Sequence, residues 1–147
     1  MIAYVDSSLV VRAYLEDETG SADAQRLLAD RSIAKYTGRL TRIEVSGAIV
    51  RAARAGRPVL RDDALRRLDA DLRPGGRIKV IAADDADIEA RALAIAREHG
   101  LRALDALHVG LASIAIPKLA DKGEPIGFAS RDGDQAGVAE ALGFAAV

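Results

Sequence analysis

Short apolar runs alternate along this chain with longer segments whose apolar residues recur every three or four positions. A short apolar run is typical of a buried strand, whereas the longer spacing is typical of an amphipathic helix. Strands separated by helical segments of about ten or more residues pair in parallel through crossover helices. The pattern therefore predicts an α/β fold, a three-layer α/β/α sandwich with a central parallel sheet of four to five strands. The strands are expected at residues 2–5, 32–37, 77–82 and 126–129.

The predicted helices are bounded by residues that commonly cap or break helices. Ser7 and Ser8 offer an N-terminal cap for the first helix, and Thr41 offers one for the third. Pro117 is expected to end the sixth helix, because proline lacks the backbone N–H that continues a helix. The helices are expected at residues 9–15, 19–31, 42–55, 61–72, 84–98, 104–116 and 134–142.

The composition narrows the chemistry that the chain can perform. The chain has 147 residues, two histidines and no cysteine. The lack of cysteine excludes disulfides, cysteine-ligated zinc sites, iron–sulfur clusters and thiol nucleophiles. The length is that of one domain, and no repeat or linker divides it, so we expect a single domain over residues 1–147. Any catalysis is expected to depend on carboxylates.

Nothing in the sequence indicates a membrane or an export signal. No apolar run approaches the roughly 20 residues that span a bilayer, and no basic stretch precedes an apolar one at the N-terminus. We therefore expect a cytoplasmic protein with no membrane partner. The phosphate-binding loops G-x-x-x-x-G-K-[ST] and G-x-G-x-x-G are absent, which excludes nucleotide binding of those two kinds.

The charged residues are balanced in number but not in kind. The chain carries 21 Lys and Arg against 22 Asp and Glu, and since four of the 21 are lysine, 17 are arginine. Arginine suits bidentate phosphate recognition, although a biased genome composition would also enrich it. With three tyrosines and two phenylalanines, the chain has too few aromatic residues for a base-stacking platform, so any nucleic acid would be held mainly by its backbone. The arginine-rich segment 51–67 is either a solvated helical face or an RNA-binding surface.

Four acids follow strands or begin the helices that come after them. They are Asp6 after the first strand, Glu44 in the third helix, Asp105 at the start of the sixth helix and Asp132 after the fourth strand. A single acid in a first helical turn is explained by the helix dipole. Four acids at one sheet edge would repel one another unless a cation lay among them, and carboxylates are ligands that Mg²⁺ or Mn²⁺ prefer. We therefore expect a divalent metal that activates water for phosphodiester cleavage.

Four stretches of the sequence resemble the motifs of a known family. The four acidic motifs of PIN-domain ribonucleases, in particular of the VapC toxins of bacterial toxin–antitoxin pairs, are similar to VDSS, TRIEVSGAI, RALDALHVGLA and FASRDGDQAGVAEALGF. The resemblance covers nearly the whole chain, with the motifs in the family's order and with family-like gaps. It implies a PIN-like fold and a metal-dependent endoribonuclease that is the toxin of a toxin–antitoxin pair.

The resemblance also implies roles for individual acids. It assigns the catalytic positions to Asp6, Glu44, Asp105 and Asp132. The metal, Mg²⁺ or Mn²⁺, would be held by Asp6, Asp105 and Asp132, with Glu44 and Asp134 as further candidates. The sequence RDGD places two acids where many relatives have one, so it leaves open whether Asp132 or Asp134 lies closer to the metal.

Two serines match supporting positions of the same motifs. Ser8 matches a small polar residue that supports the first acid, and Ser130 matches the Ser or Thr that precedes the fourth. Both are expected to orient acids rather than to react.

The resemblance implies partners as well. VapC relatives typically form homodimers and bind a VapB antitoxin whose tail occupies the active-site groove. We therefore expect an RNA substrate, a VapB-like antitoxin and a homodimer. The sequence leaves open the RNA target, the cleavage position, the preferred metal and the number of ions, the oligomeric state and the identity of the antitoxin.

Two other functions are compatible with an α/β sheet that carries acids. A receiver-like phosphoacceptor signalling domain could hold Mg²⁺ with Asp6 and Asp84, but it also needs paired acids after the first strand and a lysine after the last. The stretches VDSS and FASRD contain neither. A non-catalytic PIN-fold interaction domain would be expected to lack one or more of the four acids, and their presence favours catalysis.

The remaining titratable candidates are expected to have structural roles. His108 could reach the site from its helix, but a core or interface histidine is the favoured interpretation. His99 lies at a helix C-terminus, where a polar or cationic side chain is favourable. An N-terminal helix cluster, rather than a ligand set, is expected for Asp84, Asp85 and Asp87.

Overall fold

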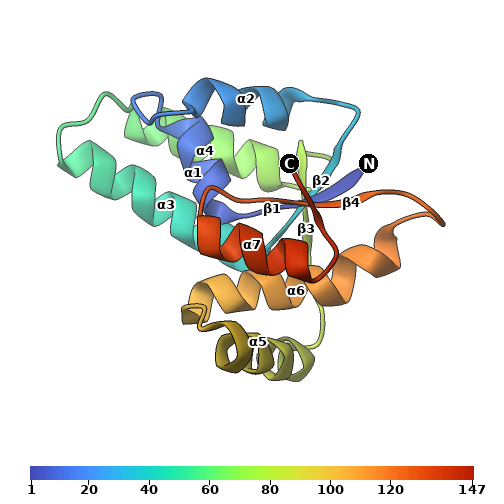
Figure 1. The fold of residues 1–147 in the computed structure, drawn as a ribbon. Helices are drawn as coiled ribbons and strands as arrows, with labels where there is room; N and C mark the ends of the chain where they lie inside the picture. The colour runs from blue at the N-terminus through green and yellow to red at the C-terminus, as the bar shows by residue number, and fades with distance from the viewer.

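The computed structural model describes residues 1–147 and has a central sheet of five strands, all parallel (Figure 1). The strands are β1 (Ile2–Val5), β2 (Ala34–Gly38), β3 (Ile78–Ile81), β4 (Ile126–Ala129) and β5 (Ala145–Ala146). Their order across the sheet is β3-β2-β1-β4-β5, so β1 lies in the centre. The predicted parallel sheet of four to five strands is confirmed, and the short β5 adds the fifth strand beside β4.

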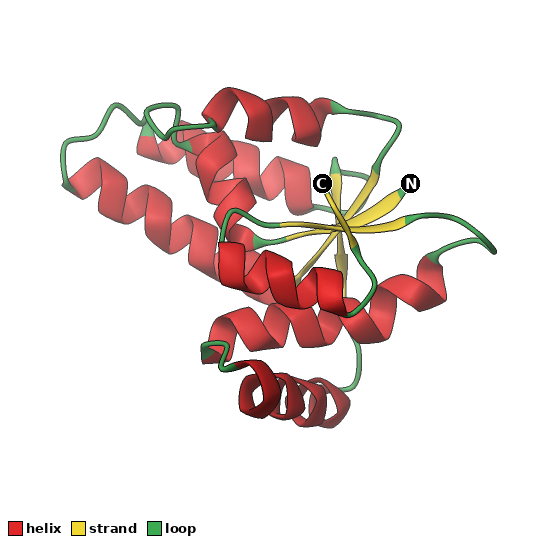
Figure 2. Ribbon diagram, in the orientation of Figure 1, coloured by secondary structure: helices red, strands yellow, loops and turns green.

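Helices cover both faces of the sheet, as Figure 2 shows. They are α1 (Ser7–Tyr14), α2 (Ser21–Ala29), α3 (Arg39–Arg54), α4 (Arg61–Leu72), α5 (Asp85–His99), α6 (Ala103–Leu119) and α7 (Gly133–Ala141). One cluster of buried residues packs the helices α1, α2, α3 and α4 on one face of the sheet. A second cluster packs α5, α6 and α7 on the other face. The predicted three-layer α/β/α sandwich is therefore confirmed. None of the helices has both the length and the apolar character needed to cross a membrane.

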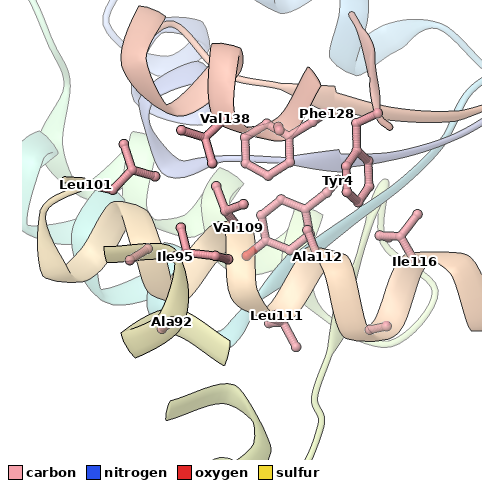
Figure 3. Packing of buried hydrophobic residues seen from close by; sticks show 14 of the residues in the cluster. Tyr4, Ala92, Ile95, Leu101, Val109, Leu111, Ala112, Ile116, Phe128 and Val138 are labelled. Carbon is pink, nitrogen blue, oxygen red and sulfur yellow. The ribbon is translucent and has the colours of Figure 1, made fainter. Parts of the chain in front are cut away.

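The core on the α5–α7 face is built around two stacked aromatic rings (Figure 3). The rings of Tyr4 and Phe128 lie 5.3 Å apart between centroids, and they pack against Val109 and Ile116 of α6. Each large apolar side chain buried in this way stabilises the fold by about 1.5–3 kcal/mol. This cluster fixes the position of α6 against β1 and β4.

Two helix starts differ from the sequence predictions. The cap of α1 is Asp6, whose carboxylate accepts a hydrogen bond from the Ser8 backbone N–H at 2.9 Å, rather than either serine. Helix α3 begins at Arg39 directly after β2, so Thr41, the predicted cap, lies within the first turn. The buried Thr41 hydroxyl is 2.6 Å from the hydroxyl of Thr37. The sequence prediction placed the helix start by its capping residue, which does not reveal that β2 and α3 join here without a loop.

The end of α6 also differs from the prediction. Pro117 lies inside the helix, which continues to Leu119. A proline removes one backbone hydrogen bond, and so close to the C-terminus little regular helix is lost. The Ala120 N–H still closes the helix on the Ile116 carbonyl at 3.1 Å. Proline is therefore tolerated in the last turn of α6.

The order of the strands reverses at β1, because β2 and β3 lie on one side of it and β4 and β5 on the other. Val5 at the end of β1 pairs with Ala129 at the end of β4, and the Asp6 N–H donates to the Ala129 carbonyl at 2.9 Å. The crevice outside the carboxyl ends of such neighbouring strands is the usual place for a site in a parallel sheet. The fold therefore brings the residues that follow β1 and β4 to this crevice.

Candidate active site

Asp6 is the most tightly held of the predicted acids. Its side chain is only 3% exposed, although it follows the central strand at the crevice. One carboxylate oxygen accepts from the Ser8 N–H at 2.9 Å, and the other accepts from Nε2 of Gln135 at 3.2 Å. Because both of its oxygens accept hydrogen bonds, the Asp6 carboxylate is held in one position at the site.

A buried histidine lies between Glu44 and Asp6. His108 lies on α6 with its Nε2 2.6 Å from Glu44 Oε2 and 3.7 Å from Asp6 Oδ1. Its Nδ1 shares a 2.7 Å hydrogen bond with the Tyr4 hydroxyl, which also accepts from the Gly38 N–H at 3.0 Å. His108 is buried, as the favoured interpretation had it, and it also reaches the site, as the alternative interpretation had it, by joining two of the predicted acids.

The charge state of His108 reflects this position. Burial by itself lowers the pKa of His108, but the hydrogen bond that it donates to Glu44 and the negative charges of Asp6 and Glu44 outweigh burial, so the pKa is raised. A raised pKa favours the imidazolium form between the two carboxylates. We call Asp6 and Glu44 the histidine-bridged pair; His108 is buried, whereas the Glu44 side chain is 24% exposed.

Asp105 and Asp132 are joined by an arginine that the sequence analysis missed. Arg102 precedes α6, and its Nε donates to Asp105 Oδ2 at 2.9 Å while Nη2 donates to Asp132 Oδ2 at 3.1 Å. The hydrogen bond to Asp105 and the charges of Asp105 and Asp132 raise the pKa of Arg102. The Arg102 side chain is 80% exposed. We call Asp105 and Asp132 the arginine-bridged pair; their own side chains are only 20% and 30% exposed.

The two predicted serines lie between the ends of β1 and β4. The hydroxyls of Ser8 and Ser130 are 3.2 Å apart, and Ser130 accepts from the Asp132 N–H at 3.0 Å. Ser130 also donates to the side-chain oxygen of Gln135 at 2.6 Å. Both serines thus lie beside the residues that contact Asp6 and Asp132.

Gln135 is a second residue that the sequence analysis missed. It is fully buried in the first turn of α7. Its side-chain Nε2 donates to the Asp6 carboxylate and, at 3.4 Å, to the backbone carbonyl of Asp105. Its backbone N–H donates to the Asp132 carboxylate at 3.0 Å, which caps α7. An acid followed three residues later by glutamine is a capping pattern, and that pattern could have singled out Gln135. Through Gln135, three of the four acids are connected.

Asp134 lies outside this network. It is exposed on α7 and makes no hydrogen bond to another site residue, whereas Asp132 bonds both Arg102 and Gln135. The geometry therefore favours Asp132 over Asp134 as the fourth acid.

Two cavities border the site. A cavity of about 830 Å³ is lined by Arg102, Asp105, Asp132 and Asp134, together with small residues of α7. A second cavity of about 380 Å³ lies against Tyr4 and His108, and its walls combine apolar and charged residues. The arginine-bridged pair therefore borders the larger cavity, whereas the histidine-bridged pair lines neither of the two.

The four carboxylates supply the hard oxygen donors that Mg²⁺ and Mn²⁺ prefer. As the side chains stand, no three His, Asp or Glu residues form a group that could hold a metal ion. Arg102 occupies Asp105 and Asp132, so it would have to leave them for an ion to bind. Its high exposure makes this exchange feasible, because exposed ion pairs contribute only about 0–1 kcal/mol. The donor set fits a divalent ion on that condition.

The other titratable candidates lie elsewhere. Asp84 caps α5 by accepting from the Ala86 N–H at 2.9 Å, and Asp85 pairs with Arg39 at 2.7 Å. These contacts match the expected N-terminal helix cluster. His99 lies at the end of α5, as expected from the sequence, and lines the larger cavity.

Comparison with known protein families gives one match. The family model described as the PIN domain matches residues 3–140, which run from β1 into α7 and include all four acids. No curated protein is matched by the chain.

Proposed function

The chain belongs to the PIN-domain family, whose members are generally nucleases, and from this premise we propose that it is a metal-dependent endoribonuclease and the toxin of a toxin–antitoxin pair. The observation that supports the proposal most is the junction of carboxylates from four chain segments at the crevice beside β1. Asp6, Glu44, Asp105 and Asp132 are joined there through His108, Gln135 and Arg102.

The proposed metal is Mg²⁺ or Mn²⁺. Asp6, Asp105 and Asp132 would hold it, with Glu44 as a further ligand. When bound, such an ion supplies an activated water and neutralises charge that develops on the phosphodiester oxygens. Arg102 would release Asp105 and Asp132 as the ion binds, and its freed guanidinium would remain beside the crevice, where it can contact a phosphate.

The chain's own residues orient the acids. The Ser8 N–H and the Gln135 amide hold both oxygens of Asp6, and the 2.6 Å contact with His108 holds Glu44 against the same point. These acids are thus preorganised before any ligand arrives, which reduces the reorganisation that the reaction requires.

The proposed partners rest on the resemblance to VapC toxins. They are an RNA substrate, a VapB-like antitoxin and a second copy of the chain. The receiver-like alternative gains no support from the fold, because Asp84 follows β3 at the sheet edge and caps α5, two strands away from Asp6. A non-catalytic interaction domain is distinguished from the proposal by the presence or absence of cleavage.

The test is incubation of the purified protein with total RNA in Mg²⁺, in Mn²⁺ and in chelator, beside the Asp105→Asn variant prepared in parallel. We expect RNA fragments that depend on the metal and on Asp105. Fragments that are equally abundant in the variant would come from a contaminant, and a lack of cleavage in both metals would contradict the nuclease proposal.

A further inference from the structure

Most of the arginines in the segment 51–67 are engaged by other residues. Arg57 is bound to Asp17 and Glu18, Arg61 to Asp62 and Arg66 to Asp63, while Arg67 lies over the ring of Tyr14. Only Arg51 and Arg54 remain without an ion pair or an aromatic partner. The segment as a whole is therefore not a uniform basic face, and its free positive charge is concentrated at two residues of α3.

Arg51 and Arg54 lie in a groove between α3 and α4. This groove has a volume of about 550 Å³ and is lined by three arginines but only one acid. The acid, Asp69, is paired with Arg42 at 2.8 Å, so the groove keeps the charges of Arg51 and Arg54. Both side chains are exposed. An open groove with two unneutralised guanidinium groups attracts a polyanion.

The groove lies on the same helix as Glu44. Glu44, Gly47 and Arg51 are spaced three and four residues apart, so they lie on the same face of α3. A side chain at Gly47 would begin 3.0 Å from the Arg51 guanidinium, which shows that this guanidinium folds back over Gly47. Gly47 is one helical turn, about 4.5 Å of rise, from Glu44. The arginine charge is therefore displaced along α3 toward the turn that carries Glu44.

We propose that Arg51 and Arg54 form a phosphate-binding track on α3 that holds the backbone of single-stranded RNA next to the bond cleaved at the acids. The inference rests on the proposed function and adds the path of the substrate to it. Guanidinium groups bind phosphate through two parallel hydrogen bonds. The scarcity of aromatic residues agrees with recognition through the backbone rather than through stacked bases. The groove shares its helix face with Glu44, so RNA is favoured over an acidic protein segment.

The test measures binding without cleavage. A fluorescently labelled single-stranded RNA of mixed sequence is titrated with the protein in chelator, at several salt concentrations. The variants are Arg51→Gln, Arg54→Gln and the double variant. The matched control is Arg97→Gln, which removes an exposed, unpaired arginine from α5 on the other side of the sheet. Thermal melting verifies that each variant is folded.

We expect each α3 variant to bind RNA roughly tenfold more weakly at low salt, and the double variant to lose more than either. The slope of log affinity against log salt should fall by about 0.7 for each phosphate contact removed. Arg97→Gln should bind like wild type. The proposal is overturned if the α3 variants bind as tightly as Arg97→Gln, or if they lose affinity for poly-glutamate while RNA binding is unchanged.

The outcome is separable from that of the nuclease test. If wild-type protein binds RNA through Arg51 but never cleaves it, the phosphate-binding track is supported and the nuclease proposal is rejected. If wild-type protein cleaves RNA while the α3 variants keep full RNA affinity in chelator, the nuclease proposal is supported and the phosphate-binding track is rejected.

Discussion

The four site acids form two pairs, and each pair is bridged by a basic side chain in a different environment. Asp6 and Glu44 meet at His108, which is 2% exposed and also bonds Tyr4 in the core. Asp105 and Asp132 meet at Arg102, which is 80% exposed. Both bridging side chains contact two carboxylates, but they differ in what surrounds them.

This difference in burial separates two tasks. A charge contact inside the protein is strong and costly to disrupt, because water does not replace the lost partner. An exposed contact is weak and easily exchanged. The buried His108 bridge is therefore suited to holding a fixed geometry, and the exposed Arg102 bridge is suited to being exchanged for a ligand.

Loss of one carboxylate charge from either pair is expected to have the largest effect. Asp6→Asn and Asp105→Asn each remove a ligand charge from the proposed metal site, so the rate of metal-dependent RNA cleavage should fall at least about a hundredfold. The measurement is the initial rate of cleavage of a labelled RNA in excess Mn²⁺. Asp121→Asn, an exposed acid in the loop before β4, is the matched control and should keep wild-type activity. Full activity in either site variant would remove that residue from the site.

The bridging cations should differ in their effect on stability. His108→Ala leaves a cavity and removes the partner of Tyr4 and Glu44, so the free energy of unfolding should fall by about 2–4 kcal/mol. Arg102→Ala should change it much less, because water replaces the contacts of an exposed guanidinium. Urea unfolding in chelator measures both. Equal losses in the two variants would show that burial does not separate the pairs.

Metal affinity should respond to the exposed bridge. Arg102→Gln frees Asp105 and Asp132, so Mn²⁺ should bind about three- to tenfold more tightly, by titration calorimetry. Arg102→Lys keeps the charge and should remain closer to wild type. Weaker Mn²⁺ binding in Arg102→Gln would mean that the arginine supports the metal site rather than competing for it.

The smallest effect is a pH dependence of stability that only the buried bridge should show. Because the pKa of His108 is raised in the folded state, its contribution is full below the ordinary histidine value of about 6.5 and is lost as the pH rises through the folded-state pKa. The free energy of unfolding of wild type in chelator should therefore approach that of His108→Gln as the pH rises. The difference between wild type and Arg102→Gln should stay constant, since arginine remains charged. A constant difference for His108 would contradict the raised pKa.

The sequence predicted the backbone of the site better than its connections. The strand at 2–5 and the helix at 61–72 have the predicted bounds, because their signals are local runs and breaks. The sequence also predicted that Asp6 and Asp132 lie at the same crevice, because each follows a strand of a parallel sheet. These predictions need only the order of elements along the chain.

The contacts of His108 could not be predicted in the same way. His108 contacts Glu44 across 64 positions of sequence and Tyr4 across 104. No local pattern carries such a contact, since it arises only when α6 packs on β1 beside α3. The local preference also misled at the start of α1, where serines were the predicted cap and Asp6, a predicted site acid, caps the helix. One residue can serve both roles because the helix begins at the crevice.

The central position of β1 has a consequence for synthesis. β1 is made long before one of its neighbours in the sheet, β4, which starts at Ile126. At about 5–20 residues per second, several seconds separate the emergence of Asp6 from that of Asp132. During that interval a nascent chain has no complete acid cluster, even if its first helices have already formed. The strand order thus delays assembly of the crevice until β4 and Asp132 have left the ribosome, and truncation before β4 should yield chains without it.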